Sequence, residues 1–351
     1  MTQAATLHDL LAEHVAASVL FERMPNDWVR CVACGHRCKI APDHDGICKV
    51  RFNRRGVLYA PHGYVAGIQI DPIEKKPFFH VMPGASALSF GMLGCDYHCE
   101  YCQNWNTSQA IRDPKAASLP RFVTAEQIVG LALERQIPIM TSTYNEPLIT
   151  SEWAVEIFKL AKTYNIKCSF VSNGNGTRDV LDFIRPYVQL YKIDLKGFRQ
   201  KSYQRLGGTL STVLESIQTL KQMNVWVEVV TLIVPGFNDS DDELKDIAQF
   251  LFSVSADMPW HVTAFHADYK MMETEDASAK MLVRAAEIGY DEGLHFVYAG
   301  NSWGNVSRFE NTHCPFCDEL LIERIGFSVK SNRLKAGTCP KCAKSIPGVW
   351  Q

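Results

Sequence analysis

Three cysteines lie close together in the run GCDYHCEYCQNW, namely Cys95, Cys99 and Cys102. Their C-x3-C-x2-C spacing supplies three thiolates, one fewer than the four that usually hold a four-iron cluster. A cluster held in this way leaves one iron free to bind a substrate or a cofactor. The alternative is a zinc site completed by His98 or a distant residue, although zinc usually takes cysteines in C-x2-C pairs. The spacing alone therefore favours an iron–sulfur site with one open coordination position.

Eight of the other nine cysteines form two sets of four. The amino-terminal set consists of Cys31, Cys34, Cys38 and Cys48. Its C-x2-C-x3-C-x9-C spacing suits zinc or a second iron–sulfur cluster equally. His36 and His44 are either alternative ligands or solvated loop residues. With four thiolates the site is coordinatively closed, which predicts a structural or electron-relay role rather than catalysis.

The carboxyl-terminal set consists of Cys314, Cys317, Cys339 and Cys342. Two C-x2-C pairs flank the sheet-forming segment LLIERIGFSV, an arrangement that resembles a zinc ribbon. Four thiolates around zinc would contribute folding energy to a segment too small for a core of its own. The remaining cysteine, Cys168, lies in the apolar run IKCSFVS and is predicted to be a buried core residue.

Between the outer cysteine sets the chain alternates between strand-like and helical patterns. The strand-like runs cover residues 87–93, 137–143, 167–173, 190–196, 226–234, 260–265 and 294–300. Helical patterns lie between them, with Thr124 as an N-cap, Ser151 at a helix start and a turn at 238–240 before another helix. Six or seven such units favour an incomplete (β/α) barrel with a parallel sheet. No G-x-G-x-x-G follows the first strand, which weighs against a dinucleotide-binding domain.

Parallel barrels gather their functional side chains at the carboxyl ends of the strands. The three-cysteine loop begins just after the first predicted strand. The residues that end the later strands include Tyr144, Asn145, Glu146, Asn173, Gly174, Asp194, Lys196, Asn238, Asp239, His266 and Asp268. Each is also explained as a turn or capping residue, but five polar strand ends beside one cysteine loop predict an active site. Asp194 and Lys196 are two residues apart and so share one face of their strand.

Composition sets broad limits on the function. The 351 residues carry a net charge of −2, which gives no global basic field for nucleic acid. No apolar run approaches the ~20 residues needed to span a membrane. Leu7, Leu11 and Val15 share one helical face, which predicts an amphipathic helix rather than a signal peptide. We therefore expect a cytoplasmic protein whose cysteines are metal ligands rather than disulfides.

These patterns divide the chain into five parts. We expect an amino-terminal amphipathic helix over 1–25, a four-cysteine metal-binding segment over 26–60, a lead-in hairpin over 61–86, a partial barrel over 87–300 and a zinc-ribbon-like module over 301–351. The predicted fold class is α/β, a partial (β/α)6 TIM-like barrel with a cysteine-rich segment before it and the zinc-ribbon-like module after it.

The order of several short motifs resembles a known family. The stretch DPIEKKPFFHVMPGASALSFGMLGCDYHCEYCQNW is followed by TYNEP, SNGNG, KIDLK, VPGFND and FHADYKM. This series resembles the radical S-adenosylmethionine (SAM) activating enzymes of glycyl radical systems. It looks closest to their relative, the radical SAM protein of the AmmeMemoRadiSam system, which the flanking cysteine sets and the closing IPGVW also fit. The resemblance implies a radical SAM barrel and an oxidoreductase. Such an enzyme cleaves SAM reductively at a [4Fe–4S] cluster, and the resulting 5′-deoxyadenosyl radical abstracts hydrogen from a substrate.

The resemblance also implies roles for single residues. Cys95, Cys99 and Cys102 would bind the cluster, and Tyr101 is the aromatic residue that the family places before the last cysteine. Glu146 would help to hold the amino group of SAM.

Further implied contacts lie on the next strand ends. Asn173 and Gly174 would line the SAM groove, and Asp194 would support a cation or polar site. Lys196 and His266 would lie near the SAM carboxylate.

The chain departs from the activating enzymes at one position, where an arginine often precedes the Val-Pro-Gly turn. Here the residues are Val229, Val230 and Thr231, with Glu228 nearby. The departure leaves open whether the substrate is a glycyl radical enzyme or a small molecule, a peptide or RNA. The implied partners are a low-potential flavodoxin or ferredoxin donor and companion proteins of the AmmeMemoRadiSam system.

Two other functions stay open. One is an activase for a glycyl radical enzyme. The other is a non-enzymatic zinc scaffold that binds nucleic acid or protein. Its basic surface would be formed in the ribbon segment by Arg324, Lys330, Arg333, Lys335, Lys341 and Lys344.

Overall fold

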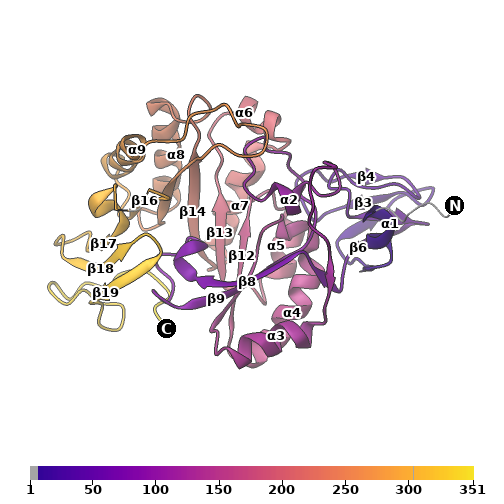
Figure 1. Ribbon diagram of the computed structural model, residues 1–351, viewed down its shortest axis with the longest axis horizontal. Coiled ribbons are helices and arrows are strands. Elements are labelled where there is room, and N and C mark those ends of the chain that lie inside the picture. The colour runs from indigo at the N-terminus through magenta and orange to yellow at the C-terminus, as the bar shows by residue number, and fades with distance from the viewer. Residues whose placement is uncertain (1–6, 303) are drawn as a thin grey trace.

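An eight-stranded sheet forms the centre of the computed structural model, which describes residues 7–302 and 304–351 (Figure 1). In spatial order its strands are β16 (Val297–Gly300), β15 (Trp260–Ala264), β14 (Trp226–Ile233), β13 (Leu190–Asp194), β12 (Lys167–Ser172), β11 (Ile139–Ser142), β9 (Ser86–Gly91) and β8 (Gly67–Pro72). Neighbours from β9 to β16 are parallel, and β8 pairs antiparallel with β9. Because β8 and β16 are the edges of the sheet, the barrel is incomplete.

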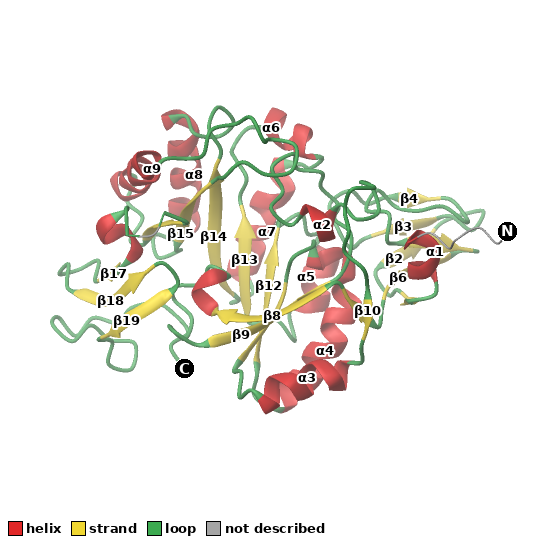
Figure 2. Ribbon diagram, in the orientation of Figure 1, coloured by secondary structure: helices red, strands yellow, loops and turns green. Residues whose placement is uncertain are grey.

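Helices cover the outside of this sheet (Figure 2). They are α3 (Ala125–Glu134), α4 (Ser151–Thr163), α5 (Arg178–Ile184), α6 (Gln200–Leu206), α7 (Leu210–Gln222), α8 (Asp241–Val254) and α9 (Ala279–Asp291). Shorter helical turns are α2 (Trp105–Ser108), η1 (Ile73–Lys75), η2 (Pro147–Thr150) and η3 (Ser307–Glu310). Thr124 caps α3 in a reciprocal capping box with Gln127, as its position predicts. In the described chain, six helical crossovers join seven parallel strands, so the sheet agrees with a (β/α)6 arrangement that ends in one further strand.

The sequence predicts the barrel strands well because both faces of the sheet are covered. Such strands read as nearly continuous apolar runs. In β14, for example, Val227, Val229 and Val230 are all buried. Among the polar residues of these strands, Ser142, Ser172 and Asp194 stand at the carboxyl ends, the edge where barrel active sites form.

The amino-terminal segment differs from its prediction. Within the described residues only α1 (Leu7–Ala12) is helical, and the helix predicted over 1–25 is wrong beyond it. The short strands that follow are β1 (Val15–Ala17), β2 (Phe21–Arg23), β3 (Val29–Cys31), β4 (Lys39–Ile40), β5 (Phe52–Arg54), β6 (Val57–Pro61) and β7 (Tyr64–Val65); β10 (Arg121–Phe122) pairs with β7. Val15 pairs with Pro61, so sheet pairing overrides the helix propensity of the adjoining alanines. The predicted lead-in hairpin also differs, because the partner of β8 is the first barrel strand itself.

The carboxyl-terminal module lies at the opposite end of the molecule from the amino-terminal segment (Figure 1). Its strands β17 (Thr312–His313), β18 (Leu320–Ile325) and β19 (Ser328–Asn332) form an antiparallel sheet. Arg324 is only 2% exposed and donates hydrogen bonds to the Phe79 carbonyl and the Thr312 hydroxyl, both at 2.8 Å. The prediction that Arg324 belongs to a basic surface is therefore wrong, since its guanidinium anchors the module to the barrel. The backbone of Val349 adds two hydrogen bonds, to His80 and Met82.

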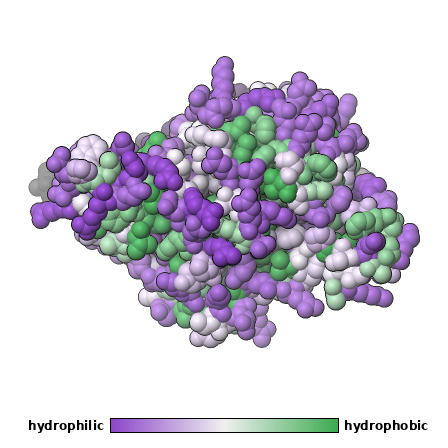
Figure 3. Space-filling view, turned by 180° about the vertical axis from the view of Figure 1, so that it is seen from behind, coloured by the Kyte–Doolittle hydropathy of each residue, from purple (hydrophilic) through white to green (hydrophobic). Residues whose placement is uncertain are grey.

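Hydrophilic residues cover most of the face shown in Figure 3, with hydrophobic residues in small groups among them. None of the helices in the described parts of the chain combines the length and the apolar character required to cross a bilayer.

Candidate active site

The three-cysteine loop follows β9 and lines a small cavity of about 90 Å³. Besides Cys95, Cys99 and Cys102, its walls include the predicted site residues Glu146, Asn173, Asp194 and Lys196. Burial raises the pKa of all three thiols, that of Cys99 to about 12. Thiols that are buried together in this way are inert until a metal centre stabilises their thiolates. Three thiols facing one cavity therefore fit a cluster that takes three protein ligands.

A larger cavity of about 600 Å³ adjoins the small one and shares Cys99, Cys102, Asp194 and Lys196 with it. Tyr101 and the exposed His266 also line it, so the structure brings these two predicted residues to the site. Gly174 lines neither cavity. Its φ of +75° and the 2.8 Å that would separate an added Cβ from Ile193 show that glycine is needed there for the turn.

Glu146 follows β11 and is 2% exposed. Its carboxylate accepts hydrogen bonds from the Ser172 hydroxyl and the Asn173 backbone N–H, both at 2.7 Å, and from the Leu148 N–H at 3.0 Å. Burial, together with the nearby charge of Asp96, raises the pKa of Glu146 to about 8, although these hydrogen bonds act to lower it. A buried carboxylate in this state gains most from a cation, and an ammonium group would supply one.

Three charged side chains share one face at the end of β13, because alternate residues of a strand point the same way. The Lys192 ammonium contacts one oxygen of Asp194, and the Lys196 Nζ lies 3.2 Å from the other. Burial raises the pKa of Asp194, but the two lysines outweigh it and hold the pKa at about 2. Asp194 and Lys196 were predicted site residues, whereas Lys192 was missed. The period-two spacing in KIDLK was the signal that could have identified it.

Asp96 is a second residue that the sequence did not reveal. It is completely buried, and its two oxygens accept hydrogen bonds from the side-chain amides of Asn173 and Asn175 at 2.7 and 2.8 Å. Asn173 therefore fixes the cysteine loop and lines the small cavity at once.

Lys76 is buried as well. Its Nζ lies 3.0 Å from Asp71 and 3.1 Å from the Tyr144 hydroxyl, at the wall of the large cavity.

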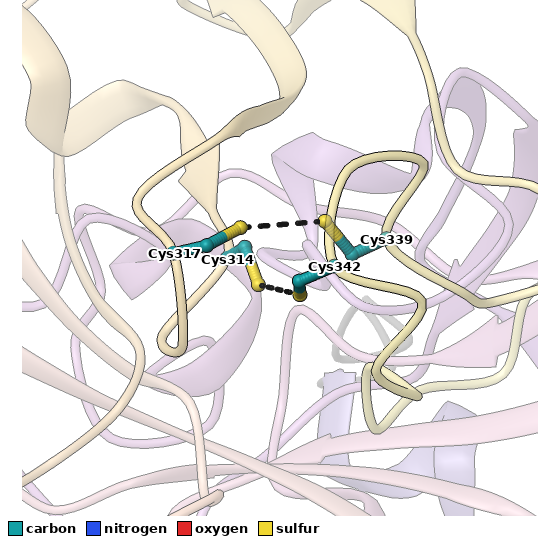
Figure 4. A group of neighbouring side chains, drawn as sticks. All are labelled: Cys314, Cys317, Cys339 and Cys342. Atoms are coloured by element: carbon teal, nitrogen blue, oxygen red, sulfur yellow. Dashed lines mark hydrogen bonds between the residues drawn. The ribbon is translucent and has the colours of Figure 1, made fainter.

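The carboxyl-terminal cysteine set converges on one point (Figure 4). All four sulfurs lie within 4.8 Å of one another. Cys314 and Cys342 are 3.5 Å apart, and Cys317 and Cys339 are 3.7 Å apart. Zn–S bonds of about 2.3 Å in a tetrahedron give S···S distances of about 3.8 Å. Four thiols at these separations fit a single ion of that kind.

The amino-terminal set does not converge in the same way. Across the described residues, no three ligand atoms of Cys31, Cys34, Cys38 and Cys48 lie within 4.8 Å of one another. His36, an alternative ligand, is not a solvated loop residue, since its Nε2 is buried and has no hydrogen-bond partner. His98, considered as a fourth ligand of the central loop, is exposed to solvent.

Comparison with known proteins agrees with this geometry. The model of the radical SAM superfamily matches residues 91–251, from the end of β9 into α8. A protein of Methanocaldococcus jannaschii described as uncharacterized is 35% identical over 334 residues, which cover 94% of this chain and 98% of that one. Residues 91–251 of this chain therefore form a radical SAM domain. Such a domain implies an enzyme that uses SAM, a [4Fe–4S] cluster and a reducing electron donor.

Other similar proteins are more distant. Pyruvate formate-lyase 1-activating enzyme of Escherichia coli is 25% identical over 174 residues, which cover 48% of this chain and 69% of that enzyme. The structure of a radical SAM methyltransferase from Sphaerobacter thermophilus aligns with a TM-score of 0.49 at 15% identity, over 70% of this chain and 73% of that one.

Proposed function

We propose that this protein is a radical SAM oxidoreductase that cleaves SAM reductively and uses the 5′-deoxyadenosyl radical to abstract hydrogen from a substrate held in the large cavity. The observation that carries the proposal is the pair of adjoining cavities. The smaller one joins all three cysteines to Glu146 and Lys196, and the larger one opens beside Cys99 and Cys102. When bound, the cluster and SAM supply the radical chemistry, and the protein supplies position and shielding.

The protein's own residues would act as follows. Cys95, Cys99 and Cys102 hold the cluster. The Glu146 carboxylate holds the ammonium group of SAM, and Lys196 faces the SAM carboxylate. Asp194 keeps Lys196 charged and oriented, because it pairs with that ammonium at 3.2 Å.

His266 stands farther out, at the exposed side of the large cavity. There it would meet the SAM carboxylate or the substrate. Tyr101, which is 4% exposed, packs edge-on against Phe237 and would keep water from the cluster.

The same proposal extends to the electron donor, the second metal, the companion proteins and the cellular compartment. A low-potential flavodoxin or ferredoxin in the cytoplasm would supply the electron. Zinc would occupy the carboxyl-terminal set, whose sulfur separations suit it. We also propose membership of the AmmeMemoRadiSam system, with its companion proteins. The match along almost the whole length of the Methanocaldococcus jannaschii protein supports an architecture shared along most of the chain.

The test is anaerobic reconstitution with iron, sulfide, SAM and dithionite. We expect an iron–sulfur absorption spectrum and formation of 5′-deoxyadenosine. Cys99→Ala should abolish the product, whereas Cys168→Ala, which alters a buried thiol on β12 away from both cavities, should keep it. If wild-type protein forms no 5′-deoxyadenosine although it carries the cluster, the proposal fails.

A second candidate is an activase for a glycyl radical enzyme, which the similarity to the Escherichia coli activating enzyme favours. That function requires a loop of another protein to reach the large cavity. A glycyl radical signal on a partner protein, after incubation with this enzyme and SAM, would distinguish it from modification of a small molecule, a peptide or RNA.

A further inference from the structure

The amino-terminal cysteines form a wider cage than the carboxyl-terminal ones. Four sulfurs meet within 4.8 Å in the carboxyl-terminal module, whereas among the described amino-terminal cysteines not even three do. A single tetrahedral ion needs sulfurs about 3.8 Å apart. In a cubane cluster each thiolate binds a different iron, so the sulfurs lie farther apart. Sulfurs that do not come within 4.8 Å of one another do not suit one tetrahedral zinc ion, whereas a polynuclear cluster takes thiolates that lie farther apart.

The cage is built into the protein interior. Cys31, Cys34 and Cys48 are each 5% exposed, and Val50 and Ile149 pack against the last two. These apolar side chains would exclude water from a cluster. A four-thiolate cluster is an anion, and such a charge needs a buried counter-charge nearby.

Arg51 supplies a cation at this place. Its guanidinium is 1% exposed and pairs with Glu152 at 2.7 Å. Its pKa is lowered by burial but raised overall by Glu152, with further contributions from Cys31 and Cys48. The cage is thus enclosed, apolar on one side and flanked on another by the buried Arg51–Glu152 ion pair, whose guanidinium interacts electrostatically with Cys31 and Cys48.

The cage also lies against the loop that carries the active-site cysteines. The backbone N–H of Gly35 donates at 2.8 Å to the carbonyl of Asn175, whose side-chain amide in turn binds Asp96 of the cysteine loop. An added Cβ at Gly94, just before Cys95, would lie 2.7 Å from Val50, just after Cys48. The backbone of the active-site cysteine loop at Gly94 therefore packs against the Val50 side chain of the amino-terminal cysteine segment.

A short chain of contacts links the two sets directly. The Cys95 sulfur lies 3.8 Å from one oxygen of Asp96. The other oxygen lies 3.9 Å from the Nε2 of His36, two residues after Cys34. Each non-covalent gap in this path is shorter than 4 Å, and every group in it is wholly or largely buried.

We propose that Cys31, Cys34, Cys38 and Cys48 bind an iron–sulfur cluster, [4Fe–4S] by ligand count, through which electrons reach the active-site loop. This cluster accepts one electron from a reduced low-potential donor protein, releases it toward Cys95 and returns to its oxidised state. Its role rests on the function proposed above, but its metal content does not.

Metal analysis of anaerobically prepared full-length protein tests the site. Wild-type protein should hold about eight irons per chain, four for each [4Fe–4S] cluster. It should also hold about one zinc, for the four carboxyl-terminal thiolates. Cys48→Ser and Cys99→Ser should each hold about four irons and keep the zinc. Cys317→Ser should lose the zinc and keep the iron. If wild-type protein holds about four irons and two zincs, and Cys48→Ser loses one zinc, the site is a zinc site and the proposal is overturned.

Electron paramagnetic resonance of the dithionite-reduced protein tests the link. Two reduced clusters that lie close together should broaden or split each other's signals, and Cys48→Ser and Cys99→Ser should each give a simpler spectrum. A wild-type spectrum equal to the sum of the two variant spectra would overturn the electron route.

His36→Leu provides a variant that keeps every thiol. It should retain the full iron content but slow the reduction of the active-site cluster by a protein donor. Unchanged reduction would remove His36 from the route. Failure of the proposed function would look different, because the protein would show eight irons and coupled signals but form no 5′-deoxyadenosine.

Discussion

The two four-cysteine sets lie at opposite ends of the molecule and are surrounded differently. The carboxyl-terminal set belongs to a small separate core with Leu321 and Ile322, and its sulfurs meet at one point. In the amino-terminal set, Cys31 belongs to the main core of the barrel, and Cys34 packs against Ile149. An equal number of thiolates thus converges on one point in a small module in one place, and lies beside the three-cysteine loop without such convergence in the other. Ligand count does not separate these two environments, whereas sulfur spacing and surroundings do.

The largest effect should come from emptying the carboxyl-terminal set. A structural zinc contributes on the order of 10 kcal/mol to the folding of a small domain. We therefore expect Cys339→Ser to disorder residues 312–346 and to make them sensitive to limited proteolysis. In Cys48→Ser the same segment should stay protected. If Cys339→Ser keeps its hydrogen-exchange protection, the set is not what stabilises this module.

Buried arginines allow the next comparison, since each end of the molecule has one. Arg51 pairs with Glu152, and Arg324 lies 3.8 Å from the buried Glu74 carboxylate. Removing one partner of a buried ion pair typically costs about 3–5 kcal/mol. Arg324→Met and Arg51→Met should both lower the free energy of unfolding by roughly this amount. Only Arg51→Met should also reduce the iron content. Exposed Lys330→Met is the matched control and should change stability by no more than about 0.5 kcal/mol.

Glu146→Gln tests the proposed SAM site, which the amino-terminal cysteine set approaches and the carboxyl-terminal set does not. Hydrogen bonds to a charged group contribute about 1.5–3 kcal/mol, so loss of the carboxylate charge should weaken SAM binding about tenfold or more. Equilibrium binding to the reconstituted protein measures this effect. Exposed Glu134→Gln should bind SAM like wild type. Equal affinities for Glu146→Gln and wild type would show that the SAM ammonium lies elsewhere.

The smallest effect should come from the surface of the amino-terminal set. Arg37 and Asp179 form an exposed ion pair at 3.2 Å. Such pairs contribute about 0–1 kcal/mol, so Asp179→Asn should scarcely change the melting temperature or the iron content. A clear loss of iron in this variant would mean that the outer contact, rather than the buried cage, holds the segment in place.

Sequence patterns predicted the barrel because the signal for each of its strands lies within a short segment of the chain. Each strand is a short apolar run, and each polar strand end is adjacent to one. The helix predicted over 1–25 was wrong because the partner of Val15 is Pro61, and no pattern within the segment reports a strand 46 residues farther on. The same limit explains why the burial of Arg324 was not predicted. Its contact with Phe79 depends on how one sheet packs against another.

The site was predicted in part for the same reason. The cysteines and Glu146 stand in recognisable local motifs, so their meeting in one cavity could be expected. Asp96 could not be identified, because its partners Asn173 and Asn175 come from the end of another strand. Lys192 could have been identified, since the alternation that pairs Asp194 with Lys196 includes it.

The contact between His80 and the last residues of the chain bears on how the protein is made. The His80 Nδ1 lies 2.6 Å from the Pro347 carbonyl, across a sequence separation of 267 residues. Contacts of such long range form late, and synthesis proceeds at about 5–20 residues per second. On the order of ten to sixty seconds therefore pass between the synthesis of His80 and that of Pro347, and only then can this contact form. During that interval the apolar surface that the last residues cover stays exposed, and such surface favours aggregation and chaperone binding.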